Sequence, residues 1–343
     1  MFNPLSNSQS KQYLDAVSAH EALTAVKAQA AEYSGGMHWK TVSGRDYLYR
    51  STDRRGNAKS LGPRSEAREE IYSQFTSRKA DLSDRLASLR EVCLLHQRVN
   101  AAMRLGFVPN EVADVCIAVG NAHLMDKAIM VIGTNAMHAY ASLGGVRFPG
   151  DILATTDVDL LWNHKAKLSL AVSRELSEAG LLGILKRADK SYELDAKNTF
   201  RARSKSNFMV DLIRQMPAPP WAQEPDRFFE HDLVATDIAN MNWLLGAPRI
   251  TQPVIAIDGR VFDIAAPDPR AFAVFKVWLS QSKDRDPLKR GRDLAQARAI
   301  IELISQRLPH FGNWGALKSF PQSALALAAG EIGLASLGAK VTP

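Results

Sequence analysis

Cysteine is scarce in this chain of 343 residues, which contains only Cys93 and Cys116. Neither residue belongs to a Cys-x-x-Cys pair or a cysteine–histidine spacing, so we expect two reduced thiols packed on helices and neither a disulfide nor a zinc site. Long apolar runs are also lacking, because no segment approaches the roughly 20 residues that a membrane span requires. Residues Met1–Lys11 do not show the basic-then-apolar order of a secretory signal. These absences predict a cytoplasmic protein without a membrane partner.

Acidic residues are in the minority, with 36 Asp and Glu against 43 Lys and Arg, a formal net charge of +7 and a pI of about 9.4. This balance favours polyanionic partners such as nucleic acids or nucleotides. Between Trp39 and Arg68 the cations alternate with aromatic side chains, which favours nucleic-acid binding, although a charged run can also be only a solvated face. The candidate nucleic-acid-binding residues are Arg45, Tyr47, Tyr49, Arg50, Arg54, Arg55 and Lys59.

The first 108 residues form a predicted N-terminal module. Apolar spacing predicts a helix over Ser8–Tyr33 and a long helix over Ser65–Leu105. Between them we expect a basic hairpin of strands Met37–Val42 and Arg45–Arg50, a turn at Thr52–Asn57 and a third short strand from Ala58 to Leu61. The long helix has an apolar stripe close to heptad spacing. It therefore predicts pairing with the first helix or with a second copy, as a homodimer.

The segment from Thr155 to Trp162 is a strand-like run that contains Asp157-x-Asp159. Residues two apart in a strand project from the same face, so the two carboxylates stand side by side. Two like charges so close are unfavourable unless a cation neutralises them, and hard oxygen ligands favour Mg²⁺ or Mn²⁺. A solvated pair at a strand edge is the alternative.

Two neighbouring segments strengthen the metal interpretation. Upstream, the apolar strand Ala128–Ile132 ends at Gly133, where the chain can turn sharply before a helix begins at Asn135. Downstream, Asn207–Ile213 is an apolar strand with one acid, Asp211, which is costly to bury without a partner. A metal ion shared by all three acids would be such a partner. Gly133, Thr134 and Asn135 would face the nucleotide.

This order of motifs resembles the DNA polymerase beta-type nucleotidyltransferase superfamily across roughly residues 110–300. The usual second small residue after the first glycine is replaced by Thr134, a departure shared with the AbiEii-type branch and with a bacterial group of nucleotidyltransferase-fold proteins. The resemblance implies transfer of a nucleoside monophosphate from a nucleoside triphosphate such as ATP to a hydroxyl acceptor. Asp157, Asp159 and Asp211 would be the catalytic residues and the ligands of Mg²⁺ or Mn²⁺.

The segment from Pro267 to Asp293 is similar to an AbiEii-type pattern of a lysine helix followed by Arg-Asp. By that likeness Lys276 would reach nucleotide phosphates, and Arg292 and Asp293 would line the next helix beside the site. The alternatives are a surface lysine whose amine extends into solvent and an ordinary local ion pair.

The expected fold class is α+β, with a nucleotidyltransferase-type mixed sheet flanked by helices. Three domains are expected: the N-terminal module 1–108, a catalytic core 109–265 and a C-terminal helical region 266–343. The core should include helices Lys165–Ala179 and Asp237–Leu245, strands Leu182–Arg187, Tyr192–Leu194 and Asn198–Arg203, and a hairpin Val254–Ile264. The C-terminal helices should cover Pro269–Gln281, Pro287–Gln306 and Gln322–Leu337.

Several alternatives remain open from the sequence. The basic N-terminal module favours RNA as the acceptor, but DNA, a protein side chain or a small molecule are also compatible. A non-catalytic nucleic-acid-binding protein that retains the fold is the competing function, and a structural role for the long helix is a third. Arg201, Arg203 and Lys205 precede the third acid, where contact with a triphosphate or a nucleic-acid backbone is one interpretation, but a solvated basic strand end is the one we expect. His138 is expected to pack in its helix.

Overall fold

The computed structural model describes residues 2–51, 57–166 and 180–332. The chain forms two compact units, one of residues 11–103 and one of residues 1–10 with 104–343. The C-terminal helices therefore belong to the same unit as the predicted catalytic core. The predicted three-domain division stays a prediction.

The larger unit is built on a six-stranded mixed sheet in the order β5-β7-β10-β9-β8, with β11 alongside the end of β10. The strands are β5 (Ile129–Ile132), β7 (Asp157–Trp162), β8 (Glu193–Leu194), β9 (Arg201–Arg203), β10 (Met209–Gln215) and β11 (Thr236–Ile238). The central pair, β7 and β10, is parallel, whereas β5 and β9 run antiparallel to their neighbours. This sheet brings together segments that are more than 80 residues apart in the sequence.

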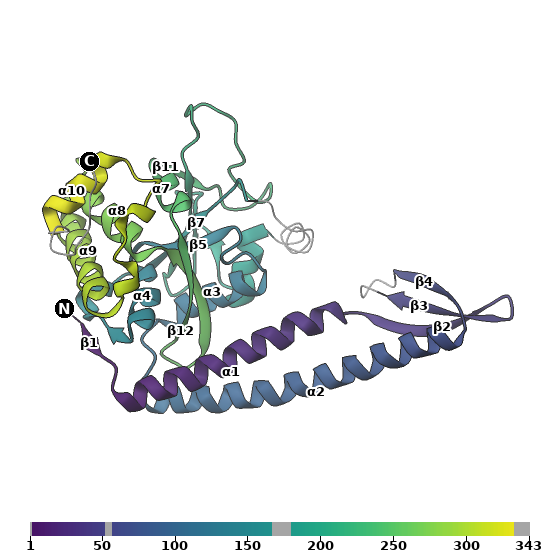
Figure 1. The fold of residues 1–343 in the computed structure, drawn as a ribbon. Coiled ribbons are helices and arrows are strands. Elements are labelled where there is room, and N and C mark those ends of the chain that lie inside the picture. Colours follow the sequence, from purple (N-terminus) through teal and green to yellow (C-terminus); the bar gives the residue numbers. More distant parts are fainter. Residues whose placement is uncertain (1, 52–56, 167–179, 333–343) are drawn as a thin grey trace. The chain divides into compact units, whose positions relative to one another are not determined.

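Helices and a long hairpin surround this sheet. They include α3 (Asn110–Asn121), the short 3-10 turn η1 (Gly133–Asn135), α4 (Ala136–Gly144), α5 (Gly150–Leu153) and α7 (Met241–Gly246). The hairpin consists of β12 (Arg249–Ile255) and β13 (Val261–Pro267), and β1 (Asn3–Pro4) pairs with β6 (Val146–Arg147). The C-terminal helices lie together, as Figure 1 shows, and are α8 (Pro269–Gln281), α9 (Pro287–Arg307) and α10 (Gln322–Ile332). The observed fold is thus the α+β class predicted from the sequence.

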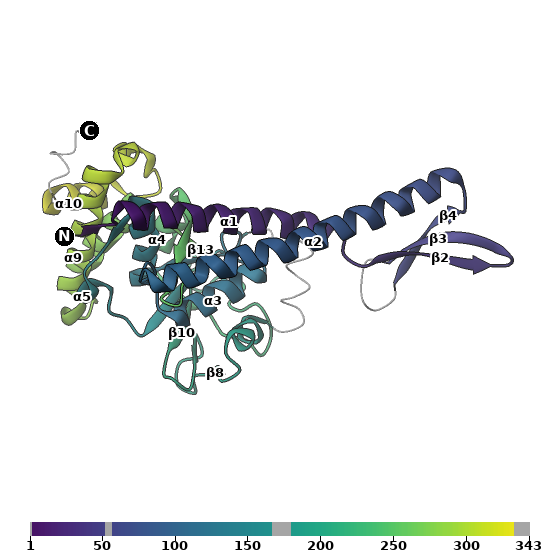
Figure 2. The same cartoon turned by 90° about the horizontal axis from the view of Figure 1, so that it is seen from below.

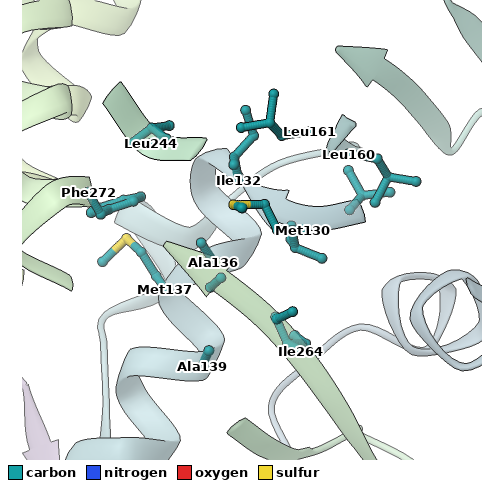
Figure 3. Close-up of a cluster of buried hydrophobic side chains, with 14 of the residues drawn as sticks. Met130, Ile132, Ala136, Met137, Ala139, Leu160, Leu161, Leu244, Ile264 and Phe272 are labelled. Carbon is teal, nitrogen blue, oxygen red and sulfur yellow. The ribbon is translucent and has the colours of Figure 1, made fainter. Parts of the chain in front are cut away.

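One hydrophobic core joins the mixed sheet, the β12–β13 hairpin and the helices around them. In the part shown in Figure 3, Met130 and Ile132 of β5 and Leu161 of β7 lie on the side of the sheet that faces Met137 of α4 and Phe272 of α8, whereas Leu160 projects from the other face. Each of these side chains is at most 6% exposed. Fully burying one such side chain contributes roughly 1.5–3 kcal/mol, so the core fixes the position of the strands that carry the acids.

Two sequence predictions within this unit were wrong. Residues 182–187 are not a strand but part of a helix over residues 180–188. Leu181, Ile184 and Leu185 are completely buried at helical spacing, and a short apolar run does not by itself distinguish a helix from a strand. The predicted helix Asp237–Leu245 is shorter, because residues 236–238 pair with β10 and Asn240 has a φ of 67°. The predicted helix Lys165–Ala179 lies largely outside the described residues.

The smaller unit contains α1 (Asn7–Glu32) and α2 (Glu66–Ala102), which lie side by side in both views (Figures 1 and 2). Gln12 on α1 donates a hydrogen bond of 2.8 Å to Asn100 on α2. The three-stranded sheet of β2 (Gly36–Val42), β3 (Arg45–Ser51) and β4 (Ala58–Pro63) is the predicted basic hairpin with its third strand. The two long helices were thus also predicted correctly. The predicted turn Thr52–Asn57, with Arg54 and Arg55, lies almost entirely outside the described residues.

Among the described residues, none of the helices combines the length and the apolar character that crossing a bilayer requires.

Candidate active site

The three acids Asp157, Asp159 and Asp211 converge on one face of the central strands β7 and β10. Because β7 and β10 are parallel and in register, Asp211 lies directly across from Asp159. Between the two acids of β7, Val158 is completely buried, as strand alternation requires. One carboxylate oxygen from each acid lies within 4.8 Å of the others. The prediction that these acids lie together on one sheet is therefore confirmed.

Gly133 sits directly against this cluster. Ile132 pairs with Asp159, so the residue after it turns over the Asp159 side chain. Gly133 adopts a φ of 65°, which favours glycine, and a Cβ at this position would clash with Oδ2 of Asp159. A glycine is needed here both for the turn and for the close approach to the carboxylate.

Asp159 lies where its negative charge is unfavourable. Burial, together with the negative charges of Asp157 and Asp211, raises the pKa of Asp159 to about 7. A bound cation would favour the ionised form, because it offsets both the burial and the like-charge repulsion. Three converging carboxylates are the hard oxygen donors that Mg²⁺ and Mn²⁺ prefer. The residues present thus fit a divalent ion. The choice of Mg²⁺ or Mn²⁺ stays a prediction.

Arg201 on β9 is the cross-strand neighbour of Asp211. Its side chain is only 21% exposed and forms an ion pair of 2.6 Å with that carboxylate. The predicted solvated basic strand end is therefore wrong for Arg201. Sequence reasoning missed this contact, since only the strand pairing places the two residues opposite each other.

Lys276 on α8 faces the same pocket from the C-terminal helices. Its Nζ donates a hydrogen bond of 2.7 Å to Asp293 on α9, whose carboxylate also accepts hydrogen bonds of 2.6 and 3.1 Å from Arg285. The side chains of Lys276 and Asp293 are 6% and 0% exposed, so the surface-lysine alternative is wrong. Although burial alone would raise the pKa of Asp293, Lys276 and Arg285 hold it below its ordinary value. This buried carboxylate positions two cations beside the pocket.

The pocket has a volume of about 430 Å³ and three kinds of wall. One wall carries the three acids, and another carries cations. The cationic residues of this wall are Lys276, Arg285, Lys289 and Arg292, and Arg201 lines the pocket beside the acids. A third wall is apolar and includes Met241, Leu244, Phe275, Trp278 and Leu279. Sequence reasoning missed Lys289 and this apolar wall, although Lys289 and Arg292 are spaced to lie on one face of α9.

A comparison with protein-family models identifies the family of the segment that contains this pocket. A family model described as nucleotidyltransferase matches residues 110–319, which include all three acids, the glycine turn and both C-terminal helices that line the pocket. The chain belongs to this nucleotidyltransferase family. The match does not separate the AbiEii-type branch from others, so that finer resemblance stays a prediction.

One solved structure similar to this chain is that of an antigenic nucleotidyltransferase-like protein from Paracoccidioides brasiliensis. The two chains are 18% identical, and the match covers 68% of this chain and 94% of that one, with a TM-score of 0.37. The family assignment rests on the family model and not on this likeness. No match was found among curated proteins.

The predicted nucleotide-binding residues occupy different places in the structure. Gly133, Thr134 and Lys276 line the pocket. Asn135 is buried behind it and donates a hydrogen bond of 2.7 Å from Nδ2 to the backbone oxygen of Asp157. Gln296, which sequence reasoning missed, is completely buried and donates a hydrogen bond of 3.1 Å to the Thr134 hydroxyl. Asn135 and Gln296 therefore support residues that face the pocket.

The predicted nucleic-acid-binding residues belong to the smaller unit, outside the family match. Arg45 and Lys59 are exposed there, and Tyr47, Tyr49 and Arg50 are partly exposed. Their predicted role is a separate question from the chemistry of the pocket.

Proposed function

We propose that this protein transfers a nucleoside monophosphate from a nucleoside triphosphate to a hydroxyl acceptor, with Mg²⁺ or Mn²⁺ as cofactor. The observation that carries the proposal is that the three clustered carboxylates of Asp157, Asp159 and Asp211 line one pocket of about 430 Å³ together with five cationic side chains. A triphosphate is an anion that needs neutralisation, and a divalent ion needs oxygen ligands. Both requirements are met within the same pocket.

In this proposal the acidic residues bind the metal ion and the basic residues bind the phosphates. Asp157, Asp159 and Asp211 would hold the divalent ion, which supplies activation of the acceptor oxygen and neutralisation of the triphosphate when bound. Lys276 and Lys289 would contact the phosphates as compact point charges. The apolar wall with Met241 would cover the nucleoside and exclude water.

The proposed reaction is an in-line displacement at the α-phosphorus. The acceptor oxygen forms a bond to that phosphorus while the bond to the oxygen that bridges the α- and β-phosphates breaks. Pyrophosphate leaves with this bridging oxygen, and the hydroxyl proton passes to Asp211. No oxidant or reductant is consumed.

The direct test is transfer of label from an α-phosphate-labelled triphosphate to cellular RNA, protein or small molecules in the presence of Mg²⁺. We expect one macromolecule or metabolite fraction to acquire label, and Asp157→Asn or Asp211→Asn to reduce the labelling at least 100-fold. Asp151→Asn is the matched control, because this acid is exposed on α5 and does not line the pocket. Full labelling by either pocket variant would contradict the proposal.

A second function competes with this one. Arg201 pairs with both oxygens of Asp211, which favours a protein that retains the fold without the reaction and binds nucleic acid through its basic surface. Thermal stabilisation by a triphosphate separates the two, because a ligand that binds the folded state raises its stability. Stabilisation that requires Mg²⁺ and disappears in Asp157→Asn supports the enzyme. Binding to RNA or DNA without any effect of triphosphate and Mg²⁺ supports the binder.

A further inference from the structure

The sheet β2-β3-β4 of the smaller unit has one face that is used for packing. On this face Leu48 is completely buried, and the ring centroid of Trp39 lies 6.0 Å from that of Tyr72 on α2. Arg50 also belongs to it, because its guanidinium lies 4.5 Å from the ring centroid of Phe75 on α2. Side chains alternate across a strand, so the residues between these point to the opposite face.

That opposite face, which we call the outer face, is made of His38, Lys40, Val42, Arg45, Tyr47, Tyr49 and Ser60. His38 stacks on Tyr49 with ring centroids 6.0 Å apart and an angle of 17° between the planes. Nζ of Lys40 lies 5.8 Å from the centroid of the same Tyr49 ring. His38, Lys40 and Arg45 are exposed. Aromatic rings and cations thus stand next to each other on an accessible face.

None of the seven described residues that make up the outer face carries a negative charge. The three strands contain one acid, Asp46, and its carboxylate lies on the packing face, where it bonds to Thr41 and Arg64. Arg64 in turn lies over the Trp39 ring at 5.1 Å. The charge left on the outer face comes from Lys40 and Arg45 and is positive.

We propose that the outer face binds single-stranded nucleic acid. The Tyr47 and Tyr49 rings would stack on bases, and Lys40 and Arg45 would neutralise phosphates, which are the two components of single-strand recognition without sequence preference. A duplex keeps its bases stacked inside and would leave the tyrosine rings without partners. A protein partner would require an apolar centre, and Val42 is the one aliphatic side chain on this face.

This geometry separates the residues that the sequence grouped together. The Arg50 guanidinium donates hydrogen bonds to the backbone oxygens of Ser34 at 2.6 Å, Ser51 at 2.5 Å and Glu32 at 3.2 Å, so it joins the end of α1 to the sheet. Lys59 is the cross-strand partner of Arg50 and therefore belongs to the packing side. Neither residue belongs to the outer face.

The proposed surface does not depend on the chemistry of the pocket. Only the use of a bound RNA or DNA as the hydroxyl acceptor would rest on the proposed function. A binding assay without triphosphate or divalent ion therefore tests the surface alone. A failure there leaves the labelling experiment unaffected, and the reverse also holds.

The test uses the full chain and fluorescein-labelled 12-nucleotide oligo(U), oligo(dT) and a mixed-sequence DNA duplex, with binding followed by anisotropy. We expect the single strands to bind more tightly than the duplex. Tyr47→Ala with Tyr49→Ala should weaken binding about 30-fold or more, because each of the two base stacks contributes about 1–3 kcal/mol and every 1.4 kcal/mol is a factor of ten. The pair Tyr47→Phe with Tyr49→Phe should retain binding, because the rings remain. Preference for oligo(U) over oligo(dT) would identify RNA, and equal binding would identify single strands in general.

The cations are tested by the salt dependence. Lys40→Gln with Arg45→Gln should reduce the slope of log affinity against log salt concentration by about 1.4, as expected for two phosphate contacts on a single strand. Lys59→Gln is the matched control from the other side of the same sheet and should leave the slope unchanged. Circular dichroism verifies the fold of each variant. The proposal is overturned by equal binding of the Tyr→Ala pair, by tighter binding of the duplex or by no binding at all.

Discussion

Arg201 donates two hydrogen bonds to Asp211, from Nε to Oδ1 at 2.7 Å and from Nη2 to Oδ2 at 2.6 Å. The hydrogen bonds to this carboxylate raise the pKa of Arg201 further, so the arginine remains charged. One positive charge is thereby fixed beside three carboxylates. It reduces their mutual repulsion before any cation binds.

We expect Arg201→Met to lower the free energy of unfolding by about 2–4 kcal/mol, because it leaves the nearly buried Asp211 without its partner. Mg²⁺ should then restore more stability to the variant than it adds to the native chain. Urea unfolding with and without Mg²⁺ measures both effects. Arg203→Met, two residues further along β9, removes a more exposed pair with Asp195 and should cost clearly less, because solvent screens that pair. An equal loss in the two variants would refute the special role of the Arg201 pair.

Asp293→Asn should destabilise the protein by about 3–5 kcal/mol, because Lys276 and Arg285 lose the buried charge that they share. It should also weaken triphosphate binding, since Lys276 is no longer held in place. Urea unfolding and calorimetric titration with a triphosphate provide the two measurements. In the control Asp15→Asn, an exposed pair with Lys11 is broken and neither quantity should change by more than about 0.5 kcal/mol. Unchanged triphosphate affinity in a folded Asp293→Asn protein would show that the pair is only structural.

Gly133→Ala should cost about 1–3 kcal/mol in unfolding free energy, because alanine is strained at a φ of 65° and its Cβ meets the Asp159 carboxylate. The displaced carboxylate should also weaken Mg²⁺ binding. Gly120→Ala on α3 serves as the comparison, since no atom lies within 4 Å of the added Cβ and the helix favours alanine. That variant should be as stable as the native chain or more so. If Gly133→Ala also matched the native chain in stability and Mg²⁺ affinity, the close approach would have no importance.

Stability should depend on pH through His138, which is buried on α4. Burial lowers the pKa of His138 to about 4, so the unfolded chain takes up a proton before the folded chain does. The neutral, buried His138 therefore makes its full contribution to the free energy of unfolding above pH 6.5, the ordinary pKa. This contribution decreases between pH 6.5 and pH 4 and is absent below pH 4. The upper limit of the loss is about 3 kcal/mol. Measured by urea unfolding across this range, His138→Gln should show a correspondingly shallower decline. Parallel declines in the two proteins would exclude His138 as the cause.

Much of this architecture could be predicted from local patterns. Apolar periodicity identified the long helices, and Asp258-Gly259 located the turn of the β12–β13 hairpin. Residues 182–187 were predicted incorrectly because their short apolar run fits both periods, and only packing on the core selects the helix. Local pattern is reliable where the repeat is long and ambiguous where it is short.

For the site, the sequence by itself determined which acids could share a face and where the chain could turn, because strand alternation and the freedom of glycine are local properties. The tertiary structure decided the partners. It placed Arg201 against Asp211, Asp293 beneath Lys276 and Arg50 on the packing side of its sheet, because these contacts depend on strand register and helix packing between segments distant in sequence. Coulomb energies and burial depend on distances in space, and the order of residues along the chain does not specify those distances.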